Sequence, residues 1–287
     1  MSVGPTTGEL ENAQKTIIEE TRYTQEHSMP CVNLFEKMSL PQGAKSRVVP
    51  KVGQFTFEDL ISGIDLEDEQ EIGMSTVELT TGEVGAKIIL EDKLVRQQDD
   101  DVFKMVGRQF GDGAGRKMDR DVIALFAGFS NVFGADNKNL TMTNWGACIA
   151  SAKALKFKGP LFGVHHPNAV YAITTSAAVT PSATYPLPHG FAEDLVKEFY
   201  KFTVNQVPIF EDGNIDKSSG VDSGYGFLGG RSAAVVLKSK GFDTERERDA
   251  SLRATEMVCT ADYGVFELDD GYGAALQYEI GNPSTNN

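Results

Sequence analysis

The sequence predicts an α+β fold, and three features of its 287 residues indicate this class. A polar arm precedes two extended segments, the second of which alternates as a hairpin strand does. One long, glycine-rich helical segment follows, and a lobe of mixed strands and helices and a long strand complete the chain. No segment gathers side chains into a catalytic cluster. The order of the parts is typical of a subunit of an assembly.

Composition limits the classes of protein that fit. A chain that is 40% hydrophobic can bury a substantial core, as one large domain or two interleaved lobes. No run of about 18 apolar residues and no apolar leader occur, so we expect no membrane span and a chain kept in the cytoplasm. Cys31, Cys148 and Cys259 lie far apart without a ligand spacing, which predicts small buried side chains instead of disulfides or a zinc site.

Residues 1–45 are predicted to form an arm. Val32, Leu34 and Phe35 make an apolar patch with little sequence nearby that could cover it. We therefore expect these three side chains to dock on a neighbouring subunit.

Residues 46–90 are predicted to form an extended hairpin. Pro50 places the first strand at an edge, and residues 76–82 alternate with period two as a return strand does. The connecting turn is acidic, and no Lys or Arg occurs between Lys51 and Lys87. The carboxylates from the turn to the return strand are Glu58, Asp59, Asp65, Glu67, Asp68, Glu69, Glu71, Glu78 and Glu83. They form either a solvated loop that blunts the strand edges or an acidic strap for basic residues of a neighbour.

If the strap interpretation holds, the contacts should be electrostatic. The candidate acidic residues are Glu67, Asp68, Glu69 and Glu71. The candidate basic residues are Lys45, Arg47 and Lys51 at the hairpin base and Arg108, Arg116 and Arg120 on the long helix.

Residues 99–127 give the strongest helix signal. Asp99, Asp100 and Asp101 complement the positive end of the helix dipole. An apolar stripe follows, made of Val102, Val106, Phe110, Ala114, Val122, Leu125 and Phe126. The helix also contains Gly107, Gly111, Gly113 and Gly115, each of which costs about 0.5–1 kcal/mol relative to Ala. We expect them to permit close approach of another backbone, because a phosphate loop would need GxxxxGK[ST].

The remaining residues predict a lobe and a return strand. Helices are expected from a cap at Thr143, around 168–171 and over about 191–201, and strands at 161–164, 207–210 and 233–237. Met257, Cys259, Ala261, Tyr263 and Val265 alternate with polar residues, which indicates a strand with one buried face. A closing strand follows at 274–280.

Motifs for chemistry are weak. His165 and His166 are adjacent on a strand and should point to opposite faces, so a structural role is expected instead of shared metal binding. Residues 212–216 begin like a calcium loop, but Lys217 and Ser223 replace its Gly and Glu. An Asx turn or a weak surface ion site near Asp212 stays open. No catalytic, cofactor-binding or metal-binding residue is predicted.

The order of the segments, with LFGVHHPNAVY at 161–171, VPIFEDG at 207–213 and ADYGV at 261–265, resembles the major capsid proteins of tailed bacteriophages. The resemblance implies the Hong Kong 97-like capsid fold. It implies an N-terminal arm (1–45), an E-loop hairpin (46–90) and a P-domain with a long spine helix (91–135). An A-domain (136–250) would follow, and 251–287 would supply the P-domain return strand and a closing A-domain strand.

The resemblance also implies self-assembly into pentamers and hexamers of an icosahedral head shell in the virion, built in the host cytoplasm. The shell would enclose double-stranded DNA without specific binding, which the net charge of −14 also favours. Only 45 residues precede the hairpin, so a separate scaffolding protein is expected, with a portal and, where the shell is decorated, a decoration protein. Residues 52–86 contain no Lys, so covalent ligation through the hairpin tip is not expected.

Two alternatives remain open. One is an encapsulin-type compartment shell of the same fold. The other is a soluble α/β enzyme that uses His165, His166 and the acidic turns around Asp212.

Overall fold

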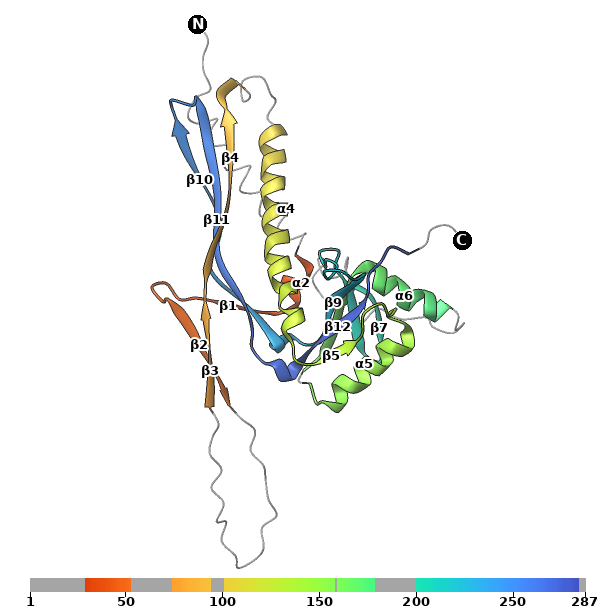
Figure 1. Ribbon diagram of the computed structural model, residues 1–287. Helices are drawn as coiled ribbons and strands as arrows, with labels where there is room; N and C mark the ends of the chain where they lie inside the picture. The colour runs from red at the N-terminus through yellow and green to blue at the C-terminus, as the bar shows by residue number, and fades with distance from the viewer. Residues whose placement is uncertain (1–28, 53–73, 94–100, 158, 179–199, 284–287) are drawn as a thin grey trace, which may run out of the picture.

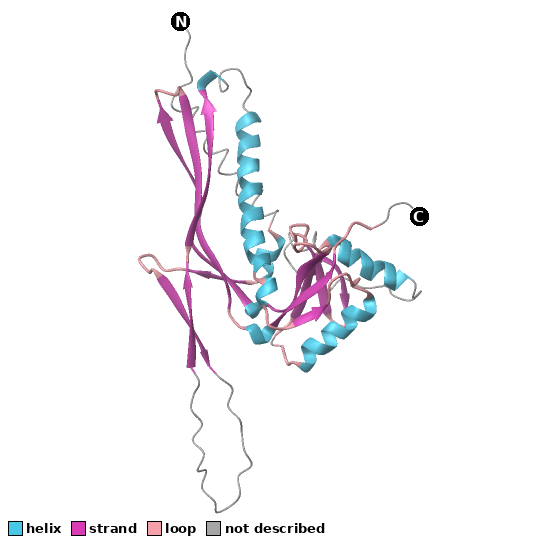
Figure 2. Ribbon diagram, viewed as in Figure 1, coloured by secondary structure: helices cyan, strands magenta, loops and turns pink. Residues whose placement is uncertain are grey.

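The computed structural model describes residues 29–52, 74–93, 101–157, 159–178 and 200–283. A long, narrow sheet runs beside one long helix, and a lobe that contains a second sheet lies at the end of both (Figure 1). A two-stranded hairpin projects from the long sheet and points away from the end of that sheet that lies beside the start of the long helix (Figure 2). Among the described residues, no helix is both long and apolar enough to cross a membrane.

The long sheet has the strand order β1-β10-β11-β4. Its bounds are β1 Glu36–Ser39, β4 Gly82–Glu91, β10 Ala234–Asp249 and β11 Ala254–Glu267. β10, β11 and β4 are antiparallel, whereas β1 is parallel to β10 and pairs Glu36 with Val235. In β11, Met257, Cys259, Ala261 and Tyr263 are buried, and the residues between them are partly exposed. The predicted one-faced strand is therefore confirmed.

The predicted spine helix is also confirmed, as α4 Asp101–Ala124. It lies along the long sheet, where Val106 packs with Leu90 and Met257. Nearer the lobe, Val122 is buried in the main core. The core continues into the short helix η1 Phe126–Gly128.

The second sheet has the order β5-β12-β9-β6-β8-β7. Its strands are β5 Val132–Gly134, β6 Leu161–His165, β7 Tyr200–Val204, β8 Val207–Glu211, β9 Ser223–Gly230 and β12 Gly273–Glu279. Helices α5 Met142–Ala154 and α6 Pro167–Ala178 flank it. Gly163 seats α5 against this sheet, because a Cβ at that position would stand 2.2 Å from the Trp145 ring.

Several expected boundaries differ from the structure. Thr141, not Thr143, caps α5, since its hydroxyl accepts a hydrogen bond from the Asn144 amide at 3.2 Å. β4 and β10 both belong to the long sheet, so the hairpin ends at Thr80, and the chain leaves the lobe near Ala233 and returns to it with β12. β4 follows β3 after one residue, and β10 follows the last residues of the lobe directly. No turn signal in the sequence therefore marked either boundary. The helix expected over 191–201 lies outside the described residues up to 199, and Tyr200 begins a strand.

Candidate assembly interface

The hairpin expected at residues 46–90 is formed by β2 Ser46–Val52 and β3 Met74–Thr80. The antiparallel register pairs Ser46 with Thr80 and Val52 with Met74. Leu79 is fully buried in a core with residues of β10 and of the segment after β1. Val49 and Val77, which face each other in the ribbon, are half-buried against the same core, whereas the neighbouring Val48 is 55% exposed. The proposed tip residues Glu67, Asp68, Glu69 and Glu71 lie outside the described part of the chain.

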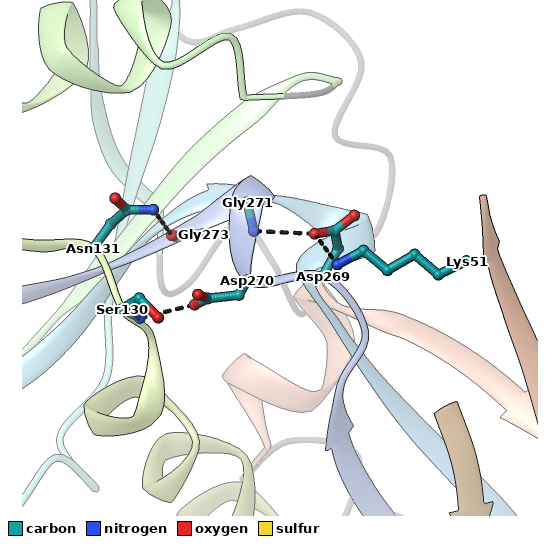
Figure 3. A network of polar contacts seen from close by, with 7 residues as sticks. All are labelled: Lys51, Ser130, Asn131, Asp269, Asp270, Gly271 and Gly273. Carbon is teal, nitrogen blue, oxygen red and sulfur yellow. Dashed lines mark hydrogen bonds and ion pairs between the residues drawn. The ribbon is translucent and has the colours of Figure 1, made fainter. Parts of the chain in front are cut away.

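A polar network ties β2 of the hairpin to the lobe (Figure 3). The Lys51 ammonium lies 2.7 Å from Asp269 Oδ1, which also accepts a hydrogen bond from the Gly271 amide at 3.0 Å. The neighbouring Asp270 accepts one from the Ser130 amide at 2.8 Å. Lys51, expected to contact a neighbouring subunit, is thus already paired within its own chain.

Most of the other candidate basic residues also have partners in the chain. Arg47 donates to the Ser39 carbonyl at 3.0 Å, while Lys45 is exposed beside the hairpin. Arg116 pairs with Asp112 one turn away on α4, and Arg120 lies 3.6 Å from Asp216. A shallow hollow on the exposed face of α4 is lined by Gln109, Asp112, Gly113, Arg116, Lys117 and Arg120. Arg108 is exposed on the same helix, so this surface mixes both signs of charge.

The apolar patch of the arm does not form a partner surface. Val32 and Phe35 are fully buried, and Leu34 is 8% exposed, all within the chain's own main core. Val32 and Leu34 lie in the short helix α2 Pro30–Leu34, which packs on α4. The expectation that the three dock on a neighbour was wrong. The pairing of β1 with the distant strand β10 draws this segment into the core, and local sequence gives no sign of such a pairing.

A buried polar junction lies where α2, α4 and the lobe meet, and sequence reasoning missed it. Cys31 and Asp119 are fully buried, and Asp212 is 1% exposed. Asp119 Oδ1 accepts hydrogen bonds from the backbone amides of Cys31 at 3.0 Å and Val32 at 3.4 Å. Asp212 Oδ2 accepts one from the Cys31 thiol at 2.9 Å. We call Cys31, Asp119, Asp212 and Asn214 the carboxyl junction.

Asn214 completes the carboxyl junction. Its side-chain amide donates to Asp119 Oδ2 at 3.0 Å, and its backbone amide donates to Asp212 Oδ1 at 2.8 Å. Burial, with a smaller contribution from Asp212, raises the pKa of Asp119 to about 9. Burial also raises the pKa of the Cys31 thiol well above its ordinary value. These two groups therefore stay protonated at neutral pH.

One sequence signal could have located this junction. Gly107, Gly111 and Gly115 are buried and follow one another at intervals of four residues, and Asp119 takes the next place in the row. A carboxylate that continues a buried row of a helix needs a partner inside the protein. Gly113 does not belong to the row and faces open space, so the expected close approach of a backbone does not explain it.

The carboxyl junction contains atoms that could bind a cation. One ligand atom each from Cys31, Asp119 and Asp212 lies within 4.8 Å of the others. In this structure the Cys31 thiol donates to Asp212, and the carboxyl oxygens of Asp119 and Asp212 accept hydrogen bonds from the protein. The turn at 212–216 has the hydrogen bond of an Asx turn, in which the Asn214 amide donates to the Asp212 side chain, and the Asp212 carboxyl is buried.

The histidine pair has the structural role expected of it. His165 is fully buried, and its Nε2 lies 3.3 Å from the Leu276 carbonyl. Burial lowers the pKa of His165 to about 3, so its ring is neutral. Its Nδ1 accepts a hydrogen bond from the His166 amide at 2.9 Å. The three cysteines are buried and free, as expected, although Cys31 has a polar partner.

No protein-family model and no curated protein matches the sequence. Solved structures do match its fold. The head structure of Helicobacter pylori bacteriophage KHP40 matches with a TM-score of 0.70 at 10% identity, over 89% of this chain and 91% of that one. The capsid of cyanophage P-SCSP1u matches with a TM-score of 0.62 at 15% identity, over 86% and 87%.

An encapsulin matches as well. The holo-SrpI encapsulin complex of Synechococcus elongatus PCC 7942 gives a TM-score of 0.65 at 12% identity, over 100% of this chain and 95% of that one. The phage structures and the encapsulin thus share the fold of this chain over most of its length. The chain has the Hong Kong 97-like capsid fold that the sequence predicted.

Proposed function

We propose that this protein is the major capsid protein of a tailed phage, a structural subunit without catalytic activity that assembles into pentamers and hexamers of an icosahedral head. The observation that carries the proposal is a fold shared with a phage head protein over 89% of this chain and 91% of that one. The shell would enclose double-stranded DNA and would be part of the virion after assembly in the host cytoplasm.

The hairpin gives a physical reason for assembly. A two-stranded ribbon is only marginally stable alone in water, and this one reaches a core only through Val49, Val77 and Leu79 among its described residues. Contact with a neighbour would cover its open strands, including the exposed Val48. Repeated around an axis, a contact of this kind between unlike surfaces closes into rings.

We further propose that the hairpin is a charged strap. Its acidic tip, Glu67, Asp68, Glu69 and Glu71, would lie on the mixed-charge face of a neighbour's spine helix, near Arg108, Arg116 and Arg120. Lys45 and Arg47 would contribute at the base. A separate scaffolding protein, a portal and, where the shell is decorated, a decoration protein are the other partners that this role requires.

Electron microscopy of the purified protein tests the proposal. Closed icosahedral particles, or capsomers with sixfold and fivefold symmetry, are the expected result, with or without a co-expressed scaffold. A small oligomer in size-exclusion chromatography and in micrographs under both conditions would contradict it and would favour the α/β enzyme alternative.

An encapsulin-type compartment is the second candidate, because the encapsulin match extends over 100% of this chain. The two candidates differ in what their particles would contain. Particles from infected or lysogenic cells that hold double-stranded DNA support the capsid. Particles that hold one stoichiometric protein cargo and no DNA support the compartment.

A further inference from the structure

The carboxyl junction joins three segments that are distant in the sequence. Cys31 belongs to α2 of the arm, Asp119 to the spine helix α4, and Asp212 to the turn that follows β8 in the lobe. The Asp212 amide is itself held by the His165 carbonyl at 3.0 Å, which fixes this turn to the second sheet. A change in the junction would therefore alter how the arm is fastened to the spine helix and to the lobe.

The two carboxyls of the junction cannot both carry a charge without a large penalty. They are buried, their oxygens lie within 4.8 Å of each other, and their hydrogen-bond partners, namely backbone amides, a thiol and the Asn214 amide, are uncharged. Two like charges in such a site raise the affinity for one proton. Asp119 holds this proton, since burial and then Asp212 raise its pKa to about 9.

Other titratable groups lie around the junction without neutralising it. His165 is neutral, and burial lowers the pKa of His166 although the charge of Asp212 opposes this. Arg120, beside Asp119 on α4, is directed to Asp216, and Lys217 pairs with Asp222 at 2.6 Å. The titratable and charged groups on the elements around the pair include Cys31 on α2, Arg120 on α4, His165 and His166 at the end of β6, and Glu211, Asp216 and Lys217 around the turn.

We propose that one proton held between Asp119 and Asp212 acts as a pH-sensitive lock that fastens α2 to the spine helix and to the lobe. At alkaline pH the proton passes to solvent, two carboxylates face each other, and α2 is released. This device belongs to the single subunit and does not depend on the proposed role in a shell.

The direction of the pH effect follows from the two protonation states. When α2 is docked, Asp119 keeps its proton up to about pH 9; when it is released, the carboxyl is hydrated and returns toward its ordinary value of 3.8. The docked state thus binds more protons between these values, and each unit of rising pH favours release by up to about tenfold. The stabilising effect is complete below pH 3.8 and is lost as the pH rises to about 9.

Infrared spectroscopy of the full-length protein observes the proton directly. We expect a protonated carboxylic-acid carbonyl band at pH 7 that disappears around pH 9 and is missing from Asp119→Asn. Asp112→Asn, an exposed carboxylate on the same helix, is the matched control and should retain the band. Absence of the band from the wild-type protein at pH 7 would overturn the proposal even if the Asn variant failed to fold.

Hydrogen exchange of the peptide that contains α2 measures release. After correction for the chemical exchange rate, opening should increase by up to about tenfold per pH unit from pH 6 to 8.5. Asp119→Asn should flatten this slope, whereas Asp112→Asn and Cys31→Ser, which keeps a donor for Asp212, should preserve it. An unchanged slope in Asp119→Asn would refute the lock. So would one equivalent of bound metal, found by elemental analysis and lost in Cys31→Ser, because a cation would then replace the proton.

Discussion

Phe35 of the arm lies edge-on against Phe227 of β9, with 5.0 Å between the ring centroids. Phe126 and Phe162 contact Phe35 as well, at 5.9 and 5.4 Å, so one residue of the arm fills the centre of an aromatic cluster. The arm is therefore part of the subunit core at this point.

The first prediction concerns this cluster. Phe35→Ala should destabilise the unassembled subunit by about 3–5 kcal/mol, because it removes a fully buried ring and leaves a cavity. Urea unfolding of the subunit measures the change, with Val48→Ala on the exposed hairpin as the control that should change little. A Phe35→Ala subunit of normal stability that failed only in assembly would restore the interpretation of this residue as a partner contact.

The second prediction concerns the spine helix. Gly113 faces open space, and helical Gly costs about 0.5–1 kcal/mol relative to Ala, so Gly113→Ala should stabilise the subunit by about that amount. Gly163→Ala is the contrasting variant, since its Cβ would meet the Trp145 ring at 2.2 Å and should destabilise the protein. Thermal unfolding compares them. Destabilisation by Gly113→Ala would contradict the open surroundings of this glycine.

The third prediction concerns the ion pair between β2 of the hairpin and the lobe. Lys51 and Asp269 are both partly exposed, with side-chain exposures of 44% and 21%, so their coupling should be only about 0.2–1 kcal/mol. A double-mutant cycle with Lys51→Gln and Asp269→Asn gives this value, and the exposed Lys217–Asp222 pair serves as a reference. A coupling of several kcal/mol would show that the pair is shielded from solvent.

The fourth prediction tests the charged strap. Changing Glu67, Asp68, Glu69 and Glu71 to Gln or Asn should lower the melting temperature of assembled particles and weaken its dependence on salt, because each ion pair with a neighbour would be lost. Scanning calorimetry at low and high salt measures both. The unassembled subunit should melt as before. Particles that kept their melting temperature and salt dependence would contradict the strap.

The fifth prediction concerns the genome. A subunit of net charge −14 should not adhere to double-stranded DNA, because such binding depends on clustered Lys and Arg. Gel-shift titration of capsomers at about 50 and 200 mM salt tests this. Micromolar binding at the lower salt that weakens steeply at the higher would reveal a basic lining.

Local patterns predicted the elements whose own periodicity defines them. The alternation at Met257–Val265 gave β11, and the apolar stripe around Val122 gave α4. Contacts between distant segments were not predictable in this way. The parallel pairing of Glu36 with Val235 decides whether this part of the arm is buried in the subunit core or lies on its surface. The hydrogen bond from Cys31 to Asp212 joins residues that carry no recognisable motif in the sequence. Such contacts depend on the assembled core, which no short window of sequence contains.

Thr81 is the single residue between β3 of the hairpin and β4 of the long sheet. The backbone beside it is closely held, since a Cβ on Gly264 of β11 would meet the Thr80 carbonyl at 2.3 Å. On the other strand, residues 40–45 join β1 to the hairpin. If the ribbon swings while the long sheet keeps its shape, the backbone rotations must be concentrated at these two places. Thr81 and residues 40–45 would then form the hinge of the hairpin. A few backbone torsion angles in these two segments would set the curvature between neighbouring subunits.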